Sequence, residues 1–359
     1  MYLIITRSFP PEVGGMQNLM WGLTRELSKN YMLKVFADYF ENHEDFDKQV
    51  SFSIERVGGI KLLRKYRKAQ LINEFIKDNK IEGIIADHWK SLELIKTNKK
   101  KVCLIHSKEI NHEKRSNLNK RVLDVLNNVD IVIANSKFTK NLAINCGVDE
   151  GRIFIINPGV DPVQELNQNS LKKVENLLKY KTPRLITISR YDKRKNHEKI
   201  IMALRNLKQI YPGIIYICIG YGEEEKNIKK LVEELNLKEQ VMFFKDISNE
   251  LKNSLLAKSD IFVMPSIIHK KSVEGFGIAY VEAAQYSIPS LGGKDGGASD
   301  AIYHNKTGLI CDGNNLDDIY SSLNSMIENK KYLEFGKNAK EYVSKFQWKK
   351  IIEKYKEIL

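Results

Sequence analysis

The sequence predicts an α/β protein with two Rossmann-like domains, and three observations support this prediction. Short β-rich runs alternate with helical patterns, which is typical of parallel sheets with right-handed crossovers. The 359 residues exceed the size at which a single core usually keeps growing. The alternation of strands and helices also begins afresh near Pro183, after a polar, lysine-containing stretch. We therefore expect two sheets rather than one.

The composition is that of an ordinary globular protein. Hydrophobic residues make up 42% of the chain and charged residues 29%, which suffices for packed cores. No apolar run approaches the ~20 residues of a membrane span. Residues 2–5 resemble a first strand and not the apolar region of a signal peptide, so we expect no signal peptide. The four cysteines are scattered and form no zinc or redox motif. We expect reduced thiols and a cytoplasmic location.

The net charge of +13 is concentrated between Arg56 and Arg121, where 18 Lys or Arg residues outnumber 7 Asp or Glu residues. Within this region, residues 60–78 predict a helix with a single apolar stripe. The stripe consists of Leu62, Tyr66, Ala69, Ile72 and Ile76. The remaining surface is basic and carries Lys61, Arg64, Lys65, Arg67 and Lys68. Such a helix suits either an anionic membrane or plain solvent. Without a recognition module, we expect no nucleic acid partner.

The first domain begins with a strand at residues 2–5, which Pro10 and Pro11 terminate. A helix follows that opens near Gly15. The loop between them lies where an open sheet usually binds its ligand, so Gly15 is a candidate binding residue. Later strands are predicted by the runs LKVFADY, GIIAD, KVCLIHS, DIVIANS and IFIIN.

Two polar features of the first domain are interpreted differently: one as part of the site and the other as a loop. His106 follows the strand KVCLI and would face the ligand crevice, which favours a role in the site. The sequence Asp45-Phe46-Asp47 has the form of a metal motif but lies in a polar stretch without further ligands. We predict that it is a loop and that the protein has no catalytic metal.

The second domain begins with the strand LITIS, which delivers Arg190 at its end, and Lys195 follows just before an amphipathic helix. Two permanent cations at such a turn suit a pyrophosphate, although simple surface charge is the alternative. A strand QVMFF comes later and ends at the same edge of the sheet. It is followed by the candidate ligand residues Lys245, Asp246 and Ile247.

The segment 271–297 carries two glutamates eight residues apart, Glu274 and Glu282, around a Gly-Phe-Gly turn. The turn predicts the start of a helix over residues 278–285. Free amides at a helix start can bind a phosphate, and here they belong to Phe276, Gly277 and Ile278. Glu282, inside the helix, could accept hydrogen bonds from a ribose diol. The alternative is that the glycines serve only tight turns and the glutamates are solvated.

The run EGFGIAYVEAAQYSIPSLGGKDGGASDAI resembles the donor-site signature of the retaining GT-B glycosyltransferases of family 4. FPPEVGGMQ, IHSKE, residues 129–161 and the Arg-x4-Lys pair resemble other parts of the same family, in order along the chain. The resemblance implies a GT-B fold with two Rossmann-like domains facing a cleft. Residues 1–165 would bind the acceptor and residues 166–340 the nucleotide sugar. Residues 341–359 would form a helix that crosses back to the first domain.

The resemblance also implies roles for the site residues. Arg190, Lys195 and the amides of residues 276–278 would stabilise the departing diphosphate in place of a metal. Glu274 would hold sugar hydroxyls, and Glu282 would hold the ribose. His106 would approach the donor sugar or the acceptor, and Gly15 the diphosphate. The backbone at residues 245–247 would pair with the base. No cofactor is expected.

The same signature is similar to that of GDP-mannose-dependent α-mannosyltransferases that act on lipid acceptors. GDP-mannose is therefore the leading donor, and UDP-glucose, UDP-galactose and UDP-N-acetylhexosamine are the alternatives. Ser299 and Asp300 stand where the family often has Pro-Glu. We expect a lipid-linked or cell-surface glycan acceptor, such as a lipopolysaccharide, at the inner face of the cytoplasmic membrane. A capsule or soluble glycan is the alternative acceptor. Two other classes remain open: a non-hydrolysing UDP-sugar epimerase and a non-catalytic nucleotide-sugar-binding protein.

Overall fold

The structure is a computed structural model that describes residues 1–359, and it divides into two domains. The N-terminal domain contains Met1–Asp161 and Phe346–Leu359, and the C-terminal domain contains Pro162–Lys345. The predicted boundary after residue 165 therefore lies slightly inside the C-terminal domain. The segment that returns to the N-terminal domain starts at Phe346, a few residues later than predicted.

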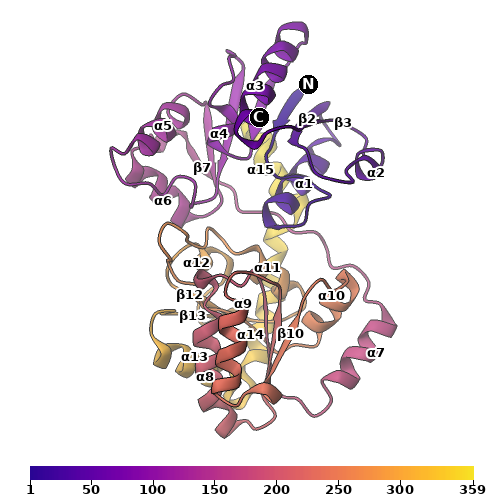
Figure 1. Ribbon diagram of the computed structural model, residues 1–359, viewed down its shortest axis with the longest axis vertical. Coiled ribbons are helices and arrows are strands. Elements are labelled where there is room, and N and C mark those ends of the chain that lie inside the picture. Colours follow the sequence, from indigo (N-terminus) through magenta and orange to yellow (C-terminus); the bar gives the residue numbers. More distant parts are fainter. The chain divides into compact units, whose positions relative to one another are not determined.

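The N-terminal domain is built on seven parallel strands in the order β3-β2-β1-β4-β5-β6-β7. Figure 1 labels β2, β3 and β7 of this sheet. The strands are β1 Tyr2–Ile5, β2 Leu33–Asp38, β3 Ser53–Val57, β4 Gly83–Ala86, β5 Lys100–Ile105, β6 Ile131–Ala134 and β7 Ile153–Ile155. The helices are α1 Gly15–Leu27, α2 Glu44–Asp47, α3 Lys61–Asp78, α4 Trp89–Leu92, α5 Asn117–Leu126, α6 Lys137–Cys146 and α15 Trp348–Ile358. Because both faces are covered, the central strands consist almost entirely of buried apolar residues.

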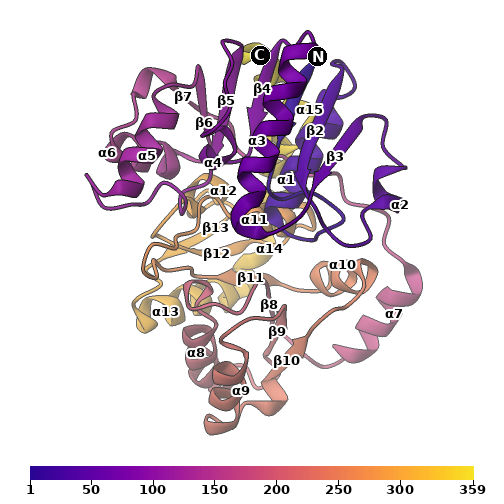
Figure 2. The same cartoon turned by 45° about the horizontal axis from the view of Figure 1, so that its top comes forward.

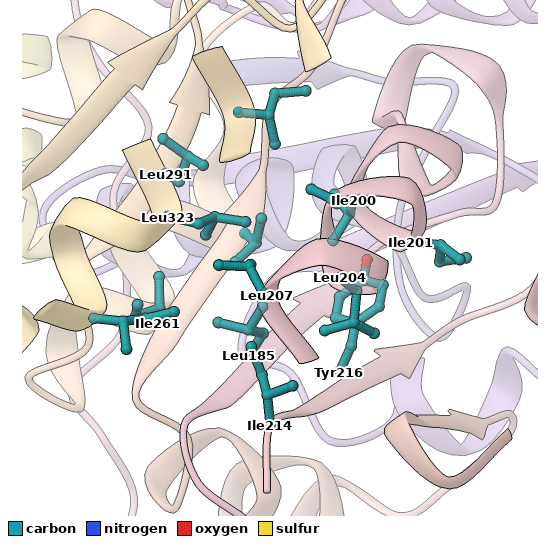
Figure 3. Close-up of a cluster of buried hydrophobic side chains, with 14 of the residues drawn as sticks. Leu185, Ile200, Ile201, Leu204, Leu207, Ile214, Tyr216, Ile261, Leu291 and Leu323 are labelled. Carbon is teal, nitrogen blue, oxygen red and sulfur yellow. The ribbon is translucent and has the colours of Figure 1, made fainter. Parts of the chain in front are cut away.

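The C-terminal domain repeats this plan with six parallel strands in the order β10-β9-β8-β11-β12-β13 (Figure 2). The strands are β8 Arg184–Ile188, β9 Ile215–Ile219, β10 Val241–Phe244, β11 Ile261–Met264, β12 Ser290–Gly293 and β13 Gly308–Cys311. The helices are α7 Gln168–Leu177, α8 His197–Ile210, α9 Glu225–Glu234, α10 Asn249–Ala257, α11 Ile278–Gln285, α12 Ala298–Ala301, α13 Leu316–Ile327 and α14 Lys331–Tyr342. Figure 3 shows the core between α8 and the sheet, where Leu204 and Leu207 lie near Leu185 and Tyr216.

Three local predictions need correction. The edge strand β3 was not predicted, because SIERV is largely polar and only its last residue is buried. Residues 45–47, predicted as a loop, belong to the short helix α2, where Asp47 accepts hydrogen bonds from the buried Arg56 at 2.6 and 3.0 Å. Lys68, predicted on the basic surface of α3, is buried, and its Nζ donates to the carbonyl of Thr6 at 2.7 Å.

The apolar stripe predicted for α3 also divides into two parts. Ala69 and Ile72 are buried in the domain core as expected. Leu62 and Tyr66, at the start of the helix, are exposed, and so are their neighbours Ile60 and Leu63. The first turns of α3 therefore present apolar side chains that no part of the domain covers.

Helix α15 is held to the N-terminal domain by Trp348, whose ring is buried against two glycines. A Cβ atom on Gly22 of α1 would lie 2.2 Å from the ring, and one on Gly159 would lie 2.4 Å from it. Figure 1 shows α1 and α15 side by side. Glycine at both positions is what allows the indole to fit.

We predict that Gly22→Ala lowers the free energy of unfolding by about 1–3 kcal/mol, because the added methyl group must displace the buried indole. The overpacking cost outweighs the gain in helix propensity of about 1 kcal/mol. The matched control is Gly151→Ala, whose Cβ would meet only Asp149 Oδ1 at 3.5 Å. Urea denaturation measures both variants. Equal stability of Gly22→Ala and the wild type would contradict the prediction.

Candidate active site

The strand order of the C-terminal sheet reverses between β8 and β11, which are neighbours and parallel. An open α/β sheet binds its ligand outside the carboxyl ends of the strands at such a point. The loop after β8 carries Arg190, Arg194 and Lys195, and the segment after β11 leads to Glu274. The topology of the sheet therefore brings the two loops that carry these charged side chains to one place.

Glu274 is shared by two cations in this place. Its Oε2 lies 2.6 Å from Lys195 Nζ and 2.5 Å from Arg194 Nη1, and all three side chains are only 11–12% exposed. Lys195 Nζ also contacts the sulfur of Met264, the last residue of β11, at 3.3 Å. Both cations bind the same carboxylate oxygen. The other oxygen, Oε1, has no partner in the protein and can accept a hydrogen bond from a ligand.

The two cations keep Glu274 ionised. Burial raises the pKa of Glu274, but the charges of Lys195 and Arg194 and the hydrogen bonds from both outweigh burial and lower that pKa from 4.5 to about 2. Burial lowers the pKa of Lys195, and the charge of Glu274 opposes this effect. The cluster thus combines one carboxylate with two cations in a water-poor environment.

The loop after β8 is shaped by hydrogen bonds to its backbone. Asp192 accepts from the amide of Lys195 at 3.2 Å, which closes a single 3-10 turn over Lys193–Lys195. Asn196 follows with a φ of +64°, and its amide group donates to the carbonyls of Pro265 at 2.9 Å and Gly313 at 2.8 Å. Asn196 therefore ties the loop after β8 to the loops after β11 and β13.

The backbone of Glu274 is held by the glycine pair Gly296 and Gly297. The amide of Gly297 donates to the carbonyl of Glu274 at 2.8 Å, and Glu274 forms a parallel bridge with Gly296. Gly296 has a φ of +125°, and a Cβ on it would lie 2.5 Å from the Glu274 carbonyl oxygen. Only glycine fits there.

Helix α11 begins directly after this bridge, over Ile278–Gln285 as predicted. Gly277 precedes it with a φ of +87°, where a Cβ would overlap the ring of Tyr280. Tyr280 Oη donates to the Met264 carbonyl at 2.6 Å, which fixes the helix to the end of β11. The first amides of α11 have no acceptor within the helix, and they could bind an anion at this edge.

Glu282 lies in α11 and is partly buried without any hydrogen bond or ion pair from the protein. Burial raises its pKa, and the charge of Lys252 on α10 opposes the shift. A partly buried carboxylate without a partner is costly in the folded protein. It has capacity to accept hydrogen bonds from a ligand.

In the N-terminal domain, the candidate residues lie at the start of α1 and at the end of β5. Gly15 is the first residue of α1. His106 follows β5, and its Nε2 lies 3.0 Å from the carbonyl oxygen of Asp87. Because a carbonyl only accepts, Nε2 carries a proton and donates it. Nδ1 of His106 has no partner in the protein.

Two family models match the chain. The model of Glycosyltransferase Family 4 covers residues 13–164, and the model of Glycosyl transferases group 1 covers residues 168–342. The chain belongs to glycosyltransferase family 4. Its two parallel-sheet domains are those of the GT-B fold, and the protein is a hexosyltransferase.

Similar proteins cover nearly the full length of this family 4 enzyme. A GDP-mannose-dependent alpha-(1-6)-phosphatidylinositol monomannoside mannosyltransferase of Mycolicibacterium smegmatis is 23% identical over 90% of this chain and 88% of its own. The protein of the same description from Mycobacterium tuberculosis is 22% identical over 97% and 94%. The structure of Anabaena HepE in complex with UDP has a TM-score of 0.83 at 18% identity, covering 99% of this chain and 98% of its own.

None of the enzyme's helices is both long enough and apolar enough to cross a membrane.

The structure brings Lys195 and Glu274 into direct contact but leaves Arg190 outside this cluster. The Arg190 side chain is 72% exposed and lies 3.5 Å from Asp192. The residues predicted to pair with the base, Lys245, Asp246 and Ile247, follow β10 at the edge of the sheet. Lys245 Nζ lies 5.6 Å from the ring centre of Tyr221. Two strands separate β10 from β11.

Sequence reasoning missed Arg194 and Asn196. The signal for Arg194 was the run Lys193, Arg194 and Lys195, but the sequence does not say which of three consecutive cations turns inward. In the structure Lys193 is exposed and Arg194 is buried. The 3-10 turn decides this, because successive side chains point in different directions around it.

We predict that Glu274→Gln lowers the free energy of unfolding by about 3 kcal/mol at pH 7, because it removes the negative charge that two buried cations share and leaves Arg194 only Asp192 at 3.8 Å. The ordinary pKa of 4.5 falls to about 2 on folding, so the contribution is fully present above pH 4.5. It is lost as the pH falls toward about 2. The stability gap between the variant and the wild type should therefore narrow over this range in denaturation curves.

The control is Glu282→Gln, eight residues away, where the expected change in stability has the opposite sign. Burial raises the pKa of Glu282, so its ionisation above that pKa opposes folding. The variant should be at least as stable as the wild type at pH 7. Equal destabilisation by both variants would contradict the roles of the two carboxylates.

Proposed function

We propose that this enzyme transfers mannose from GDP-mannose to a hydroxyl group of a lipid-linked or cell-surface glycan, with retention of the anomeric configuration. The observation that carries the proposal is the buried Glu274, ionised between Lys195 and Arg194 with Oε1 free. The relatives named for GDP-mannose-dependent mannosyl transfer, which align with 90% and 97% of the chain, support the choice of donor and of a lipid acceptor.

In this proposal, some residues of the C-terminal domain bind the diphosphate, and others bind the sugar, the ribose or the base. Lys195, the exposed Arg190 and the first amides of α11 supply positive charge for the departing diphosphate, so the proposed reaction needs no metal. Glu274 Oε1 accepts hydrogen bonds from sugar hydroxyls. Glu282 accepts from the ribose diol, and the backbone at residues 245–247 contacts the base.

Arg194 positions Glu274 and does not touch the donor in this proposal. Because Arg194 and Lys195 share one oxygen of Glu274, Lys195 can turn toward a phosphate while Arg194 keeps the carboxylate in place and ionised. In the transfer step the bond between the sugar C1 and the phosphate oxygen breaks. The acceptor oxygen bonds to C1 from the same face, and its proton passes to the departing phosphate.

We predict that the enzyme binds GDP without added metal and more tightly than UDP or ADP, and that Lys195→Ala weakens this binding roughly tenfold through the loss of a charge-assisted hydrogen bond. Isothermal titration calorimetry measures the affinities. Lys193→Ala is the matched control, because it removes the exposed neighbouring cation. Glu274→Ala should reduce mannosyl transfer more than it reduces GDP affinity.

Other outcomes of this experiment would indicate a different donor or a different function. Preference for UDP would change the donor to UDP-glucose, UDP-galactose or a UDP-N-acetylhexosamine. Release of an epimerised sugar without an acceptor would indicate an epimerase, and binding without turnover would indicate a non-catalytic protein. Normal GDP binding by Lys195→Ala would contradict the phosphate assignment.

We also propose that the enzyme works on an anionic membrane surface at its cytoplasmic side and contacts that surface through the first turns of α3. Ile60 is 70% exposed, Leu62 82% and Leu63 59%. Lys61 and Arg67 lie within one or two turns of these side chains and take part in no ion pair. Apolar side chains surrounded by cations match a bilayer with anionic headgroups.

We predict that Leu62→Ser combined with Leu63→Ser weakens sedimentation with phosphatidylglycerol vesicles by roughly tenfold or more, because two inserted side chains are lost. Leu333→Ser, which removes an exposed leucine from the C-terminal domain, is the control. Raising the salt concentration should weaken binding of the wild type. Unchanged sedimentation of the double variant would rule out this surface.

A further inference from the structure

The strand order of the N-terminal sheet reverses between β1 and β4. These strands are parallel neighbours, with Ile5 opposite Ala86 at their carboxyl ends. This is the place where an open α/β sheet takes a ligand. Arg7 stands two residues after β1, and His88 stands two residues after β4. Lys90 follows in the first turn of α4.

The backbone that carries Arg7 is fixed, while its side chain is not engaged. The buried Asp87 accepts from the Arg7 amide at 2.7 Å and from Thr6 Oγ1 at 3.0 Å. Lys68 Nζ donates to the Thr6 carbonyl at 2.7 Å. The guanidinium of Arg7 is exposed and forms no hydrogen bond or ion pair. It is therefore held at the end of β1 and open to a ligand.

His88 adds a neutral donor beside Arg7. Its Nδ1 accepts from the amide of Lys90 at 2.9 Å, so the ring proton lies on Nε2. Burial, with the nearby charge of Arg7, lowers the pKa of His88 to about 2, and the ring is uncharged at neutral pH. The Nε2–H group has no acceptor in the protein.

Lys90 is a second cation that forms no ion pair. Its Nζ lies over the Trp89 ring at 5.2 Å from the ring centre. Burial lowers the pKa of Lys90, the charges of Arg7, Arg121 and Lys65 lower it further, and the charge of Glu93 opposes the shift. Arg121 and Lys65 are themselves neutralised by Glu93, at 2.7 and 3.2 Å.

Lys65 and Arg121 are thus paired with Glu93, whereas Arg7, His88 and Lys90 form no ion pair. Two cations and one neutral N–H group stand together at the end of β1 and β4, and none has an acceptor in the protein. The charge of Arg7 lowers the pKa of Lys90 and neither side chain forms an ion pair, so a bound anion would relieve their repulsion. A guanidinium fork, an imidazole N–H and an ammonium group match the oxygens of a phosphate.

We propose that Arg7, His88 and Lys90 bind a phosphate group on the acceptor. The inference rests on the proposed function, since it names the class of acceptor whose hydroxyl receives the sugar. The phosphate belongs either to a lipid phosphodiester or to a soluble phosphate monoester. Both present the same anionic oxygens to the three side chains.

The test is an NMR titration of the full-length enzyme saturated with GDP, so that the diphosphate site is filled. One arm uses glycerol 1-phosphate, and the other uses dihexanoyl phosphatidylglycerol below its micelle concentration. The ring signal of His88, assigned with the His88→Gln variant, should shift in at least one arm. A response only to the lipid identifies a phosphodiester, and a response only to the monoester identifies a soluble acceptor.

Arg7→Gln and Lys90→Gln should each weaken this binding about three- to tenfold, as expected for charge-assisted contacts partly open to solvent. Lys99→Gln is the matched control: it removes an exposed cation just before β5, at the opposite end of the sheet, and should change nothing. The GDP affinity of each variant verifies that it is folded.

Two results would overturn the inference: no shift of the His88 signal in either arm, or unchanged affinity in both variants. Failure of the wild-type enzyme to bind any nucleotide would instead count against the proposed function. If the wild-type enzyme binds no nucleotide, the same titration without GDP still tests whether Arg7, His88 and Lys90 bind a phosphate.

Discussion

The arrangement of the candidate active site depends on one carboxylate oxygen that two buried cations share. Glu274 Oε2 neutralises Arg194 and Lys195 together. Without it, Lys195 would be buried without an ion pair, and Arg194 would keep only the longer contact with Asp192 at 3.8 Å. Several other features serve this contact. Asn196 ties the loop after β8 to its neighbours, and Gly296 allows the backbone to approach the Glu274 carbonyl. The first turn of α11 starts directly beyond the contact.

The pair of glutamates in the segment 271–297 illustrates how environment separates two identical side chains. Glu274 is surrounded by cations, and its pKa is lowered to about 2. Glu282 is partly buried without a partner, and its pKa is raised. The first is therefore a stable part of the folded protein, whereas the second carries an unsatisfied acceptor. In the mannosyl transfer we propose, these states suit a sugar-binding and a ribose-binding carboxylate.

The two domains share a plan but differ in how their charges are compensated. Each sheet reverses its strand order once, and polar residues follow the two strands at that point. In the C-terminal domain the buried cations Arg194 and Lys195 are neutralised by Glu274. In the N-terminal domain Arg7 and Lys90 form no ion pair, although the charge of Glu93 acts on Lys90. Because the cations at this point of the N-terminal sheet form no ion pair, we expect an anionic group on the acceptor as well as on the donor.

The alternation of apolar runs with helical patterns determined the fold class, because strands buried on both faces must be apolar and must be joined by helices. The glycine spacing determined the start of α11, and the family signature led to Lys195 and Glu274. The sequence could not show that Lys68 is buried, that Leu62 is exposed or that Arg194 turns inward. Neighbouring cations look alike in a sequence. Only the tertiary structure, by placing a carbonyl or a carboxylate beside one of them, decides which charge is buried and which is left for a ligand.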